Sequence, residues 1–506
     1  MSYLENLKRE ANYTTTLNGA KTHGTTGDAC LDFFAVAGGM RYRKKEEQIR
    51  LFGKAYIENP EFAMKLLFYI RDIRQGMGER QMFRTLIQYV ATKWPESAKK
   101  NVHLIAEFGR WDDLLCLLET SAKKVAVDVI REQLQKDLDA VRQREAGNLK
   151  APVSLLAKWM PSSNTSSHET RRYAKILMQE LNMNERTYRK MLAKLRANSC
   201  VTEKYLSNKK TESINYEAVP AGAMLKYRQA FRRNDREHFE DYIAEVSCGE
   251  KHIHCDTLFP YELVRPYFHI EKDSYWNCGK IIDAKGMDVL DVMWANRKLE
   301  AANQNAISVI DTSGSMFCQN GDGPLPILLS ISLGLYYAER CKGVFHNHFI
   351  TFESNPHLME IHGTTLRDKL SYIATAPWGG STNLEAVFEL ILQTAVNAGA
   401  SQDEMPSVLY IISDMEFNMA CRNGNKTVYE NAKELFEEFG YQMPAVVFQN
   451  VNSWQMQTPV TAHTKGTALT SGASTAAFTH KFDGNVTPMS HMLKVLNSER
   501  YKEVHA

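Results

Sequence analysis

With 506 residues, of which 44% are hydrophobic, the chain can bury a large core, and its length predicts more than one domain. No stretch approaches eighteen uninterrupted apolar residues, and the start lacks the apolar run of a signal peptide, which argues against a membrane protein and against secretion. The nine cysteines include no C-x-x-C pair, as is typical of reduced thiols. We therefore expect a soluble, cytoplasmic and monomeric protein that does not bind a membrane.

The charge of the chain is unevenly distributed, although the formal net charge is only +2. Residues 1–300 carry 49 Lys and Arg against 40 Asp and Glu, a net charge of +9, whereas the remaining residues carry 12 against 19, a net charge of −7. A basic first part predicts an anionic partner for that part of the chain.

Residues 1–28 are predicted to form an extended N-terminal arm or hairpin, because β-branched residues alternate there with turn formers. From residue 29 to 300, apolar residues recur at intervals of three and four, which predicts a domain of successive amphipathic helices. The expected helices are 43–58, 60–75, 79–94, 97–118, 122–145, 153–160, 169–181, 185–197, 224–240, 259–268 and 284–299. Because no fixed repeat length is legible, this pattern indicates a solenoid of irregular helical pairs.

Residues 301–506 alternate between strand and helix patterns, which predicts a doubly wound, Rossmann-like α/β domain. The expected strands are 306–310, 345–352, 357–361, 408–412, 445–450 and 467–471. The expected helices are 326–341, 365–374, 384–396, 427–440 and 488–504. The overall fold class is therefore α + α/β, with a helical part followed by an open sheet.

Hydroxyl and carboxylate side chains gather where the strands of this domain end. Asp311 follows the first strand and is followed by Ser313 and Ser315, Thr382 opens the helix 384–396, and Asp414 ends the strand 408–412. Carboxyl ends of parallel strands meet at one edge of a sheet, so we expect these five side chains to converge. An all-oxygen set suits Mg²⁺ or another hard divalent cation better than zinc.

These five residues resemble the metal-ion-dependent adhesion site of von Willebrand factor A domains. The resemblance implies that the two serines and the threonine contact the ion, that the aspartates reach it through water, and that an acidic group of a protein partner completes the coordination. The chain departs from the family pattern at Met415 and Glu416, where a glycine often follows the third-loop aspartate. Glu416 could add negative charge near the ion.

Three phrases of the helical part, at residues 69–80, 108–114 and 155–162, resemble a family of viral, bacterial and plant proteins that joins a helical half to a C-terminal von Willebrand A domain. The layout is similar to the Ro autoantigen and its TROVE module. That resemblance implies HEAT-like helix pairs bent into a ring that the A domain closes. It also implies binding of noncoding RNA on a basic face, as in a ribonucleoprotein.

Basic residues are dense between positions 158 and 236, with aromatic residues Trp159, Tyr173, Tyr188 and Tyr227 among them, where RNA bases could stack. Phosphate contacts from such a surface would make binding strongly salt-dependent. The candidate RNA-binding residues are Lys158, Arg171, Arg172, Lys175, Arg186, Arg189, Lys190, Lys194, Arg228, Arg232 and Arg233. The alternative is that these residues are solvated helix faces.

Catalysis is not expected, because the sequence has no Gly-x-Ser-x-Gly elbow and no phosphate-binding loop, and two aspartates are too few for a two-metal nuclease. The competing function is a metal-dependent protein-interaction scaffold that binds no RNA. In that case the metal site would capture an acidic residue of one partner while the solenoid holds another.

Overall fold

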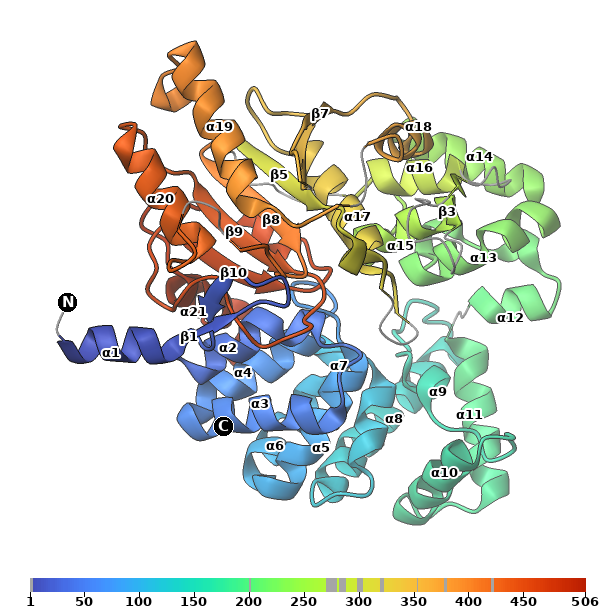
Figure 1. The fold of residues 1–506 in the computed structure, drawn as a ribbon. Coiled ribbons are helices and arrows are strands. Elements are labelled where there is room, and N and C mark those ends of the chain that lie inside the picture. The colour runs from blue at the N-terminus through green and yellow to red at the C-terminus, as the bar shows by residue number, and fades with distance from the viewer. Residues whose placement is uncertain are drawn as a thin grey trace.

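Two architectures follow one another along the chain in the computed structural model, a long helical region and then an α/β domain (Figure 1). The structure describes residues 3–199, 202–269, 280–281, 288–297, 304–318, 323–352, 354–376, 380–419 and 423–506. The predicted fold class is confirmed. None of the helices in these ranges combines the length and apolar character that a bilayer-spanning helix needs.

The N-terminal segment is only partly the extended arm that the sequence predicts. Residues Tyr3–Asn12 form helix α1, and only Tyr13–Thr15 (β1) and Lys21–His23 (β2) pair as an antiparallel hairpin. This hairpin belongs to the α/β domain by its contacts, because Thr16 donates a hydrogen bond to the carbonyl oxygen of Phe417, and Thr22 donates one to that of Thr458. The first and last parts of the chain therefore fold together.

Side-chain caps and prolines start several helices of the helical region. Asp28 caps α2, and Asn59 caps α4, which has Pro60 at its first position, where a missing N–H costs nothing. The helices are α2 (Ala29–Val36), α3 (Lys45–Glu58), α4 (Pro60–Arg71), α5 (Arg80–Lys93), α6 (Pro95–Asn101), α7 (Ile105–Phe108), α8 (Lys123–Glu145), α9 (Leu156–Trp159), α10 (His168–Glu180), α11 (Glu185–Asn198), α12 (Thr202–Ser207), α13 (Ala221–Asn234), α14 (Arg236–Ser247), α15 (Pro260–Val264) and α16 (Asp288–Ala295). A two-residue ladder, β3 (Phe268–His269) with β4 (Lys280–Ile281), lies between α15 and α16.

Several predicted helices are wrong in extent, and two of them break at residues with non-helical backbone. The stretch 97–118 divides into α6, α7 and 3₁₀ turns, and Gly109 between them has φ −130° and ψ −116°. The stretch 224–240 divides into α13 and α14 at Asp235, which has φ −153° and ψ 55°. Apolar periodicity continued across both breaks, so it could not reveal them.

A buried ion pair joins the first two phrases that the sequence analysis singled out. The guanidinium of Arg71, only 2% exposed, lies 2.7 Å from the carboxylate of fully buried Asp113, and Arg84 reaches the same carboxylate at 2.7 Å. A Cβ on Gly109 would lie 2.5 Å from Asp113 Oδ2 and 2.6 Å from Arg71 Nε. The network therefore requires the glycine, and two guanidinium groups compensate the buried charge of Asp113.

The α/β domain is built on a six-stranded sheet in the order β10-β9-β8-β5-β6-β7. All neighbours are parallel except the edge strand β7, which pairs antiparallel with β6. The strands are β5 (Ala306–Asp311), β6 (His348–Phe352), β7 (Leu358–Glu360), β8 (Val408–Ser413), β9 (Ala445–Asn450) and β10 (Thr467–Ser471), and the helices are α17 (Pro326–Ala338), α18 (Leu366–Ile373), α19 (Leu384–Ala398), α20 (Val428–Glu438) and α21 (Pro488–Leu496). The strands after β5 are added first on one side of it, as β6 and β7, and then on the other side, as β8, β9 and β10. The switch point of the sheet therefore lies between β5 and β8, and open α/β sheets bind ligands at such a point.

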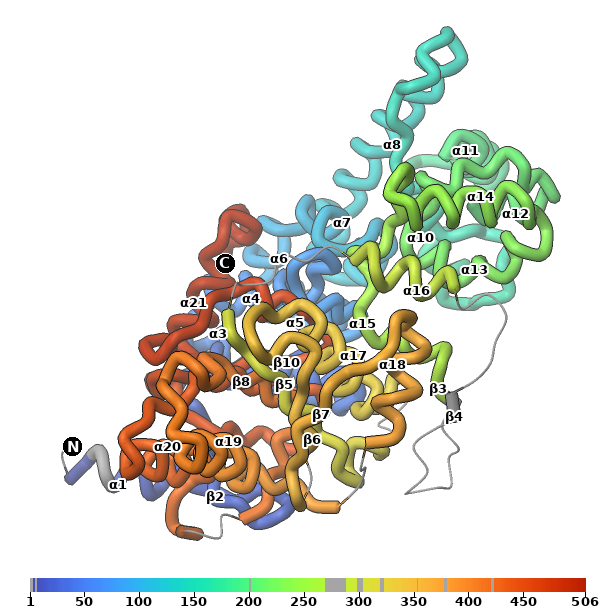
Figure 2. Tube along the Cα trace, turned by 90° about the horizontal axis from the view of Figure 1, so that it is seen from above, coloured from blue at the N-terminus to red at the C-terminus, as the bar shows by residue number. Residues whose placement is uncertain are grey.

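The helical region contacts the α/β domain at both of its ends. Helices α2 and α4 pack against α21, and α2 also contacts β10, while α15 packs on α17 and α16 on α18. Between these two contacts the helices run outward in an arc, from which α8 extends away from the body (Figures 1 and 2). The helical region thus leaves the α/β domain at one place and returns to it at another.

Candidate metal centre and basic face

The ends of β5 and β8 bring four of the five predicted metal ligands into one hydrogen-bonded cluster. Asp311 is the last residue of β5, and its Oδ1 accepts a hydrogen bond of 2.9 Å from the backbone N–H of Ser313. The hydroxyl oxygens of Ser313 and Ser315 are 3.1 Å apart, and Ser315 donates a hydrogen bond to Asp414. Because β5 and β8 are adjacent parallel strands, their carboxyl ends place these groups side by side.

The fifth residue, Thr382, lies beside the third loop rather than in that hydrogen-bonded cluster. Its backbone N–H donates to Asn418 Oδ1 at 3.3 Å, and its carbonyl oxygen accepts from the N–H of Asn418 at 2.9 Å. The residue is 1% exposed, and within the described ranges its hydroxyl group makes no hydrogen bond. The preceding residues 377–379 lie outside the part of the chain that the structure describes.

The two carboxylates of the cluster are buried without a cationic partner. Asp311 is fully buried and Asp414 is 1% exposed, and no Lys, Arg or His among the described residues forms an ion pair with either. Burial, followed by repulsion from Asp414, raises the pKa of Asp311 to about 7, and burial likewise raises the pKa of Asp414. Two uncompensated buried carboxylates flanked by hydroxyls are a donor set that fits a hard divalent cation.

Two supporting residues were missed by sequence reasoning. Ser413 donates a hydrogen bond of 2.5 Å to Asp311 Oδ2, and the indole N–H of Trp454 donates one of 3.1 Å to Asp414 Oδ2. Ser413 directly precedes Asp414, so its position at the strand end could have suggested this role. Trp454 carries no such signal, because it lies forty residues further along the chain. In each aspartate a backbone N–H group binds Oδ1, and Ser413 or Trp454 binds the other carboxylate oxygen, Oδ2. Both residues therefore fix the orientation of a carboxylate.

Glu416 lies close enough to the cluster for its charge and that of Asp414 to repel each other, but its carboxylate is held by other residues. Its carboxylate accepts hydrogen bonds from the backbone N–H of Leu17 at 2.7 Å and from Gln457 Nε2 at 2.9 Å. The side chain is therefore occupied by the N-terminal hairpin and the loop after β9. Met415 before it has φ 66°, the left-handed conformation that glycine adopts most easily, so the backbone geometry typical of a glycine is kept there by a methionine.

The predicted RNA-binding residues fall into two groups in the structure. Lys158, Arg172, Lys194 and Arg232 form ion pairs with Glu203, Glu119, Glu145, and both Glu240 and Asp288, respectively. Arg228 donates to the carbonyl oxygen of Leu225, and burial lowers its pKa. The remaining predicted residues, all exposed and without an ion pair within the described ranges, are Arg171, Lys175, Arg186, Arg189, Lys190 and Arg233.

Three of the unpaired residues line one cavity. Arg186, Arg189 and Lys190 project from α11 into an open cavity of about 650 Å³, which the loop at Ser162–Asn164 also lines. Arg196 fixes that loop, because its guanidinium donates to the carbonyl oxygens of Ala157 and Met160 and to the hydroxyl of Ser162. A positive, pre-formed hollow of this kind can receive phosphate groups.

The aromatic residues contribute less than the sequence predicted. Tyr188 is fully buried and donates a hydrogen bond to the carbonyl oxygen of Pro161, so no base can stack on it. One face of Trp159 is covered by the guanidinium of Arg110 at 3.9 Å.

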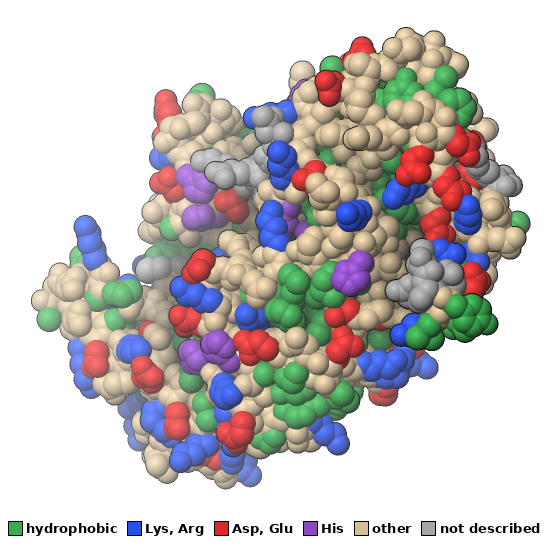
Figure 3. Space-filling model, turned by 90° about the vertical axis from the view of Figure 1, so that its left-hand side faces the viewer, with side chains coloured by type: hydrophobic (Ala, Val, Ile, Leu, Met, Phe, Trp, Pro, Cys, Tyr) green, Lys and Arg blue, Asp and Glu red, His purple; other side chains and the backbone are tan. Residues whose placement is uncertain are grey.

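On the side of the molecule where the N-terminus and α20 lie, Lys and Arg are interspersed with Asp and Glu (Figure 3). The cavity on α11 is therefore the best-defined basic feature among the predicted residues.

Together, the fold and the strand-end cluster define a helical protein that carries a C-terminal Rossmann-like α/β domain with an all-oxygen site at its switch point. The chain belongs to the family described as Domain of unknown function (DUF2828), whose model matches residues 16–130 and 123–299. A second model, described as Domain of unknown function (DUF7788), matches residues 305–503, so the two models meet close to residue 300.

The chain is also similar to a viral protein along nearly its whole length. It is 30% identical over 523 residues to Uncharacterized protein L728 of Acanthamoeba polyphaga mimivirus, covering 96% of this chain and 87% of that protein. Among solved structures it is similar to the Deinococcus radiodurans RO (RSR) protein, with 13% identity and a TM-score of 0.38 over 93% of this chain and 99% of that chain. At that TM-score, the overlap adds nothing to what this chain's own geometry says about function.

Proposed function

We propose that this protein binds RNA with its helical region and holds a divalent cation, Mg²⁺ by donor chemistry, in a metal-ion-dependent adhesion site of its α/β domain. The cation would bind between Asp311, Ser313, Ser315, Thr382 and Asp414 and would capture an acidic group of a protein partner. The role is binding rather than catalysis. The resemblance of these five residues to the von Willebrand A site supports the adhesion part.

The burial of Asp311 and Asp414 without a cationic partner carries the adhesion part of the proposal. Two carboxylates in such surroundings repel each other and lose hydration, so the folded state gains from any cation that compensates them. Ser313 and Ser315 supply hydroxyl oxygens at the same place, and hydroxyl and carboxylate oxygens are the ligands of hard divalent ions. The ion would also leave one position open toward solvent or a partner.

The adhesion part is tested by the thermal stability of Asp311→Asn with and without Mg²⁺. Saturating Mg²⁺ should raise the Tm of the wild type, by the equivalent of about 2.7 kcal/mol at one hundred times the Kd, and leave Asp311→Asn unchanged. In EDTA the variant should be at least as stable as the wild type, because the substitution removes the repulsion. Asp403→Asn, at an exposed site, is the matched control. An equal Mg²⁺ response in Asp311→Asn would refute the site.

The RNA part rests on the three unpaired cations that line the cavity on α11. A gel-shift assay with a structured RNA that bears a single-stranded 3′ tail should show binding at low salt that the triple variant R186Q/R189Q/K190Q weakens. The control K44Q/R50Q/K54Q removes the same charge from three exposed positions, Lys44 just before α3 and Arg50 and Lys54 on it, and should bind RNA as the wild type does. Equal loss in both triples would mean that only net charge matters.

A metal-dependent protein scaffold without RNA is the second candidate function. The ion pairs of Lys158, Arg172, Lys194 and Arg232 favour it, because acidic residues of the chain already compensate those cations. The same assay separates the candidates. A wild-type protein that ignores RNA at low salt would leave only the scaffold.

A further inference from the structure

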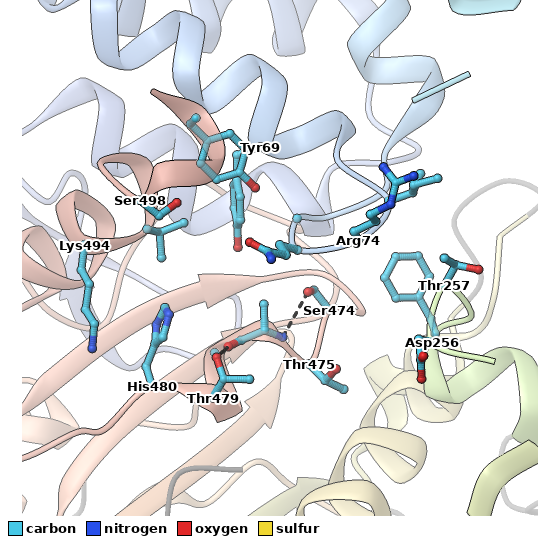
Figure 4. Close-up of a pocket in the computed structure, with 18 of the residues that line it drawn as sticks. Tyr69, Arg74, Asp256, Thr257, Ser474, Thr475, Thr479, His480, Lys494 and Ser498 are labelled. Carbon is cyan, nitrogen blue, oxygen red and sulfur yellow. Dashed lines mark hydrogen bonds between the residues drawn. The ribbon is translucent and has the colours of Figure 1, made fainter. Parts of the chain in front are cut away.

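A cavity of about 370 Å³ lies where four distant parts of the chain meet, away from the switch point of the sheet. Its walls come from the turn after α4, from the segment before α15, from Arg297 after α16, and from the loop after β10 together with α21. Figure 4 shows Lys494 and His480 on one side of it, Arg74 and Asp256 on the other, and Ser474 and Thr475 between them. Because every wall is a different part of the fold, the cavity exists only in the assembled molecule.

Arg297 is a buried cation on the wall of this cavity, and its hydrogen-bonding capacity is only partly used. It is 6% exposed, one of its terminal nitrogens donates to the carbonyl oxygen of Leu258, and its guanidinium lies 5.2 Å from the ring centroid of Tyr336. Its Nε has no hydrogen-bond acceptor, and none of the described carboxylates forms an ion pair with it. The charge of Glu262 acts on this guanidinium without forming an ion pair, and an anion that entered the cavity would supply the acceptor that Nε lacks.

A second buried nitrogen on the cavity wall also lacks a partner. His480 Nδ1 is shielded from solvent and forms no hydrogen bond in the described part of the chain. Its ring centroid is 5.2 Å from that of His491, which is 3% exposed and also lines the cavity. A neutral imidazole can donate from Nδ1, so His480 can offer a hydrogen bond to an anion in the cavity.

The charges on the wall match a doubly charged anion. Arg74, Arg297 and Lys494 oppose Asp256 alone, a net charge of +2 with the histidines neutral. A phosphate monoester carries about −1.5 to −2 at neutral pH and three acceptor oxygens, whereas a carboxylate would leave a cation uncompensated. The remaining wall includes the aromatic residues Tyr69, Phe259 and Tyr501, which suit a planar organic group.

We propose that this cavity binds a free phosphate monoester of nucleotide size, with Arg297 and His480 contacting the phosphate and Lys494 at the mouth. Arg297 provides the buried charge, and the exposed side chain of Lys494 attracts the anion from solvent. The site is separate from the strand-end cluster, so it requires no divalent cation. AMP is the probe because it combines a monoester dianion with a planar base.

The proposal is tested by calorimetric titration of the full-length protein in EDTA with AMP, adenosine and inorganic phosphate. AMP should bind, adenosine should bind at least about tenfold more weakly, and Arg297→Met should weaken AMP binding by about tenfold or more. Arg265→Met, at an exposed arginine outside the cavity, should bind AMP as the wild type does. A single cooperative thermal transition of Arg297→Met shows that the variant is folded.

Lys494→Met provides a second variant that cannot disturb the core, and it should weaken AMP binding by about threefold or more. The proposal is overturned if neither AMP nor phosphate binds, or if both variants bind AMP as the wild type does. A 5′-phosphorylated RNA decamer provides the remaining comparison. If it binds tighter than AMP through Arg297, the ligand is the end of an RNA chain and the assignment to a free nucleotide is wrong.

Discussion

Arg500 and Asp72 form an ion pair across 428 residues of sequence, with Arg500 Nε 3.0 Å from the fully buried carboxylate. The hydroxyl of Tyr501 donates to the same carboxylate at 3.1 Å. This contact fastens the C-terminal end of the chain onto the turn after α4. The stability of the helical region therefore depends on residues of the α/β domain.

Removing the guanidinium should leave the Asp72 carboxylate buried and uncompensated. We expect Arg500→Met to lower the free energy of unfolding by about 3 kcal/mol, and Asp72→Asn in the same chain to recover part of the loss. Lys502→Met breaks an exposed pair with Glu499 and should change stability by less than about 1 kcal/mol. Urea denaturation of the four proteins measures these differences. Equal effects of Arg500→Met and Lys502→Met would show that the buried ion pair contributes no more to the free energy of unfolding than the exposed one.

Gly109 should tolerate no side chain, because a Cβ there would meet Asp113 Oδ2 and Arg71 Nε. We expect Gly109→Ala to destabilise the protein by about 2 kcal/mol or more, since it forces apart a buried ion pair. Gly222→Ala, on α13 with open space around its Cβ, should instead stabilise by about 0.5 to 1 kcal/mol. Thermal unfolding of both variants measures these changes in stability. If Gly109→Ala is as stable as the wild type, the ion pair of Arg71 and Asp113 can move aside to make room for the methyl group.

His491 should make stability depend on pH. Burial, followed by the nearby His480 and Lys494, lowers the pKa of His491 to about 3. The unfolded chain takes up a proton below pH 6.5 and the folded chain does not, so stability is full above pH 6.5 and falls as the pH drops toward 3. Between pH 6.5 and 5 the loss from this residue should be about 2 kcal/mol.

Urea denaturation at pH 7 and pH 5 measures this dependence. His491→Gln should remove about half of it, because burial also lowers the pKa of His480 to about 4, whereas His463→Gln, at an exposed histidine, should leave it as in the wild type. If His491→Gln keeps the full dependence, protonation of other groups is responsible.

The salt dependence of RNA binding should report the cavity on α11. If Arg186, Arg189 and Lys190 contact phosphates, the plot of log K against log salt concentration should become shallower by about 2 in R186Q/R189Q/K190Q. Measured with one RNA over a salt series, an unchanged slope would indicate that these cations do not touch the backbone. The control variant K44Q/R50Q/K54Q should keep the wild-type slope.

The sequence predicts the sheet well because its strands are short, apolar and buried on both faces. Residues 306–310, 408–412 and 445–450 are strands in the structure, and Asp311 and Asp414 follow two of them at the expected edge. These positions depend only on where each strand ends. The local sequence pattern was therefore sufficient to predict that four of the five candidate ligands lie together, because they follow two neighbouring parallel strands.

The parts that could not be predicted depend on contacts between distant segments. Trp454 reaches Asp414 only because β9 pairs beside β8, and the carboxylate of Glu416 accepts a hydrogen bond from Leu17, near the other end of the chain. Arg172 looked free in sequence, but in the fold Glu119, in the turn before α8, lies 3.0 Å from it. No local periodicity or spacing encodes such pairs.

The central claim is that one hard cation binds among Asp311, Ser313, Ser315, Thr382 and Asp414. Crystals grown with Mn²⁺ test it most directly, because the anomalous signal of the metal locates it independently of the protein atoms. The account predicts one peak at the end of β5 and β8, at about 2.2 Å from the hydroxyls of Ser313, Ser315 and Thr382. No peak there at saturating Mn²⁺, or a metal bound only elsewhere, would contradict it.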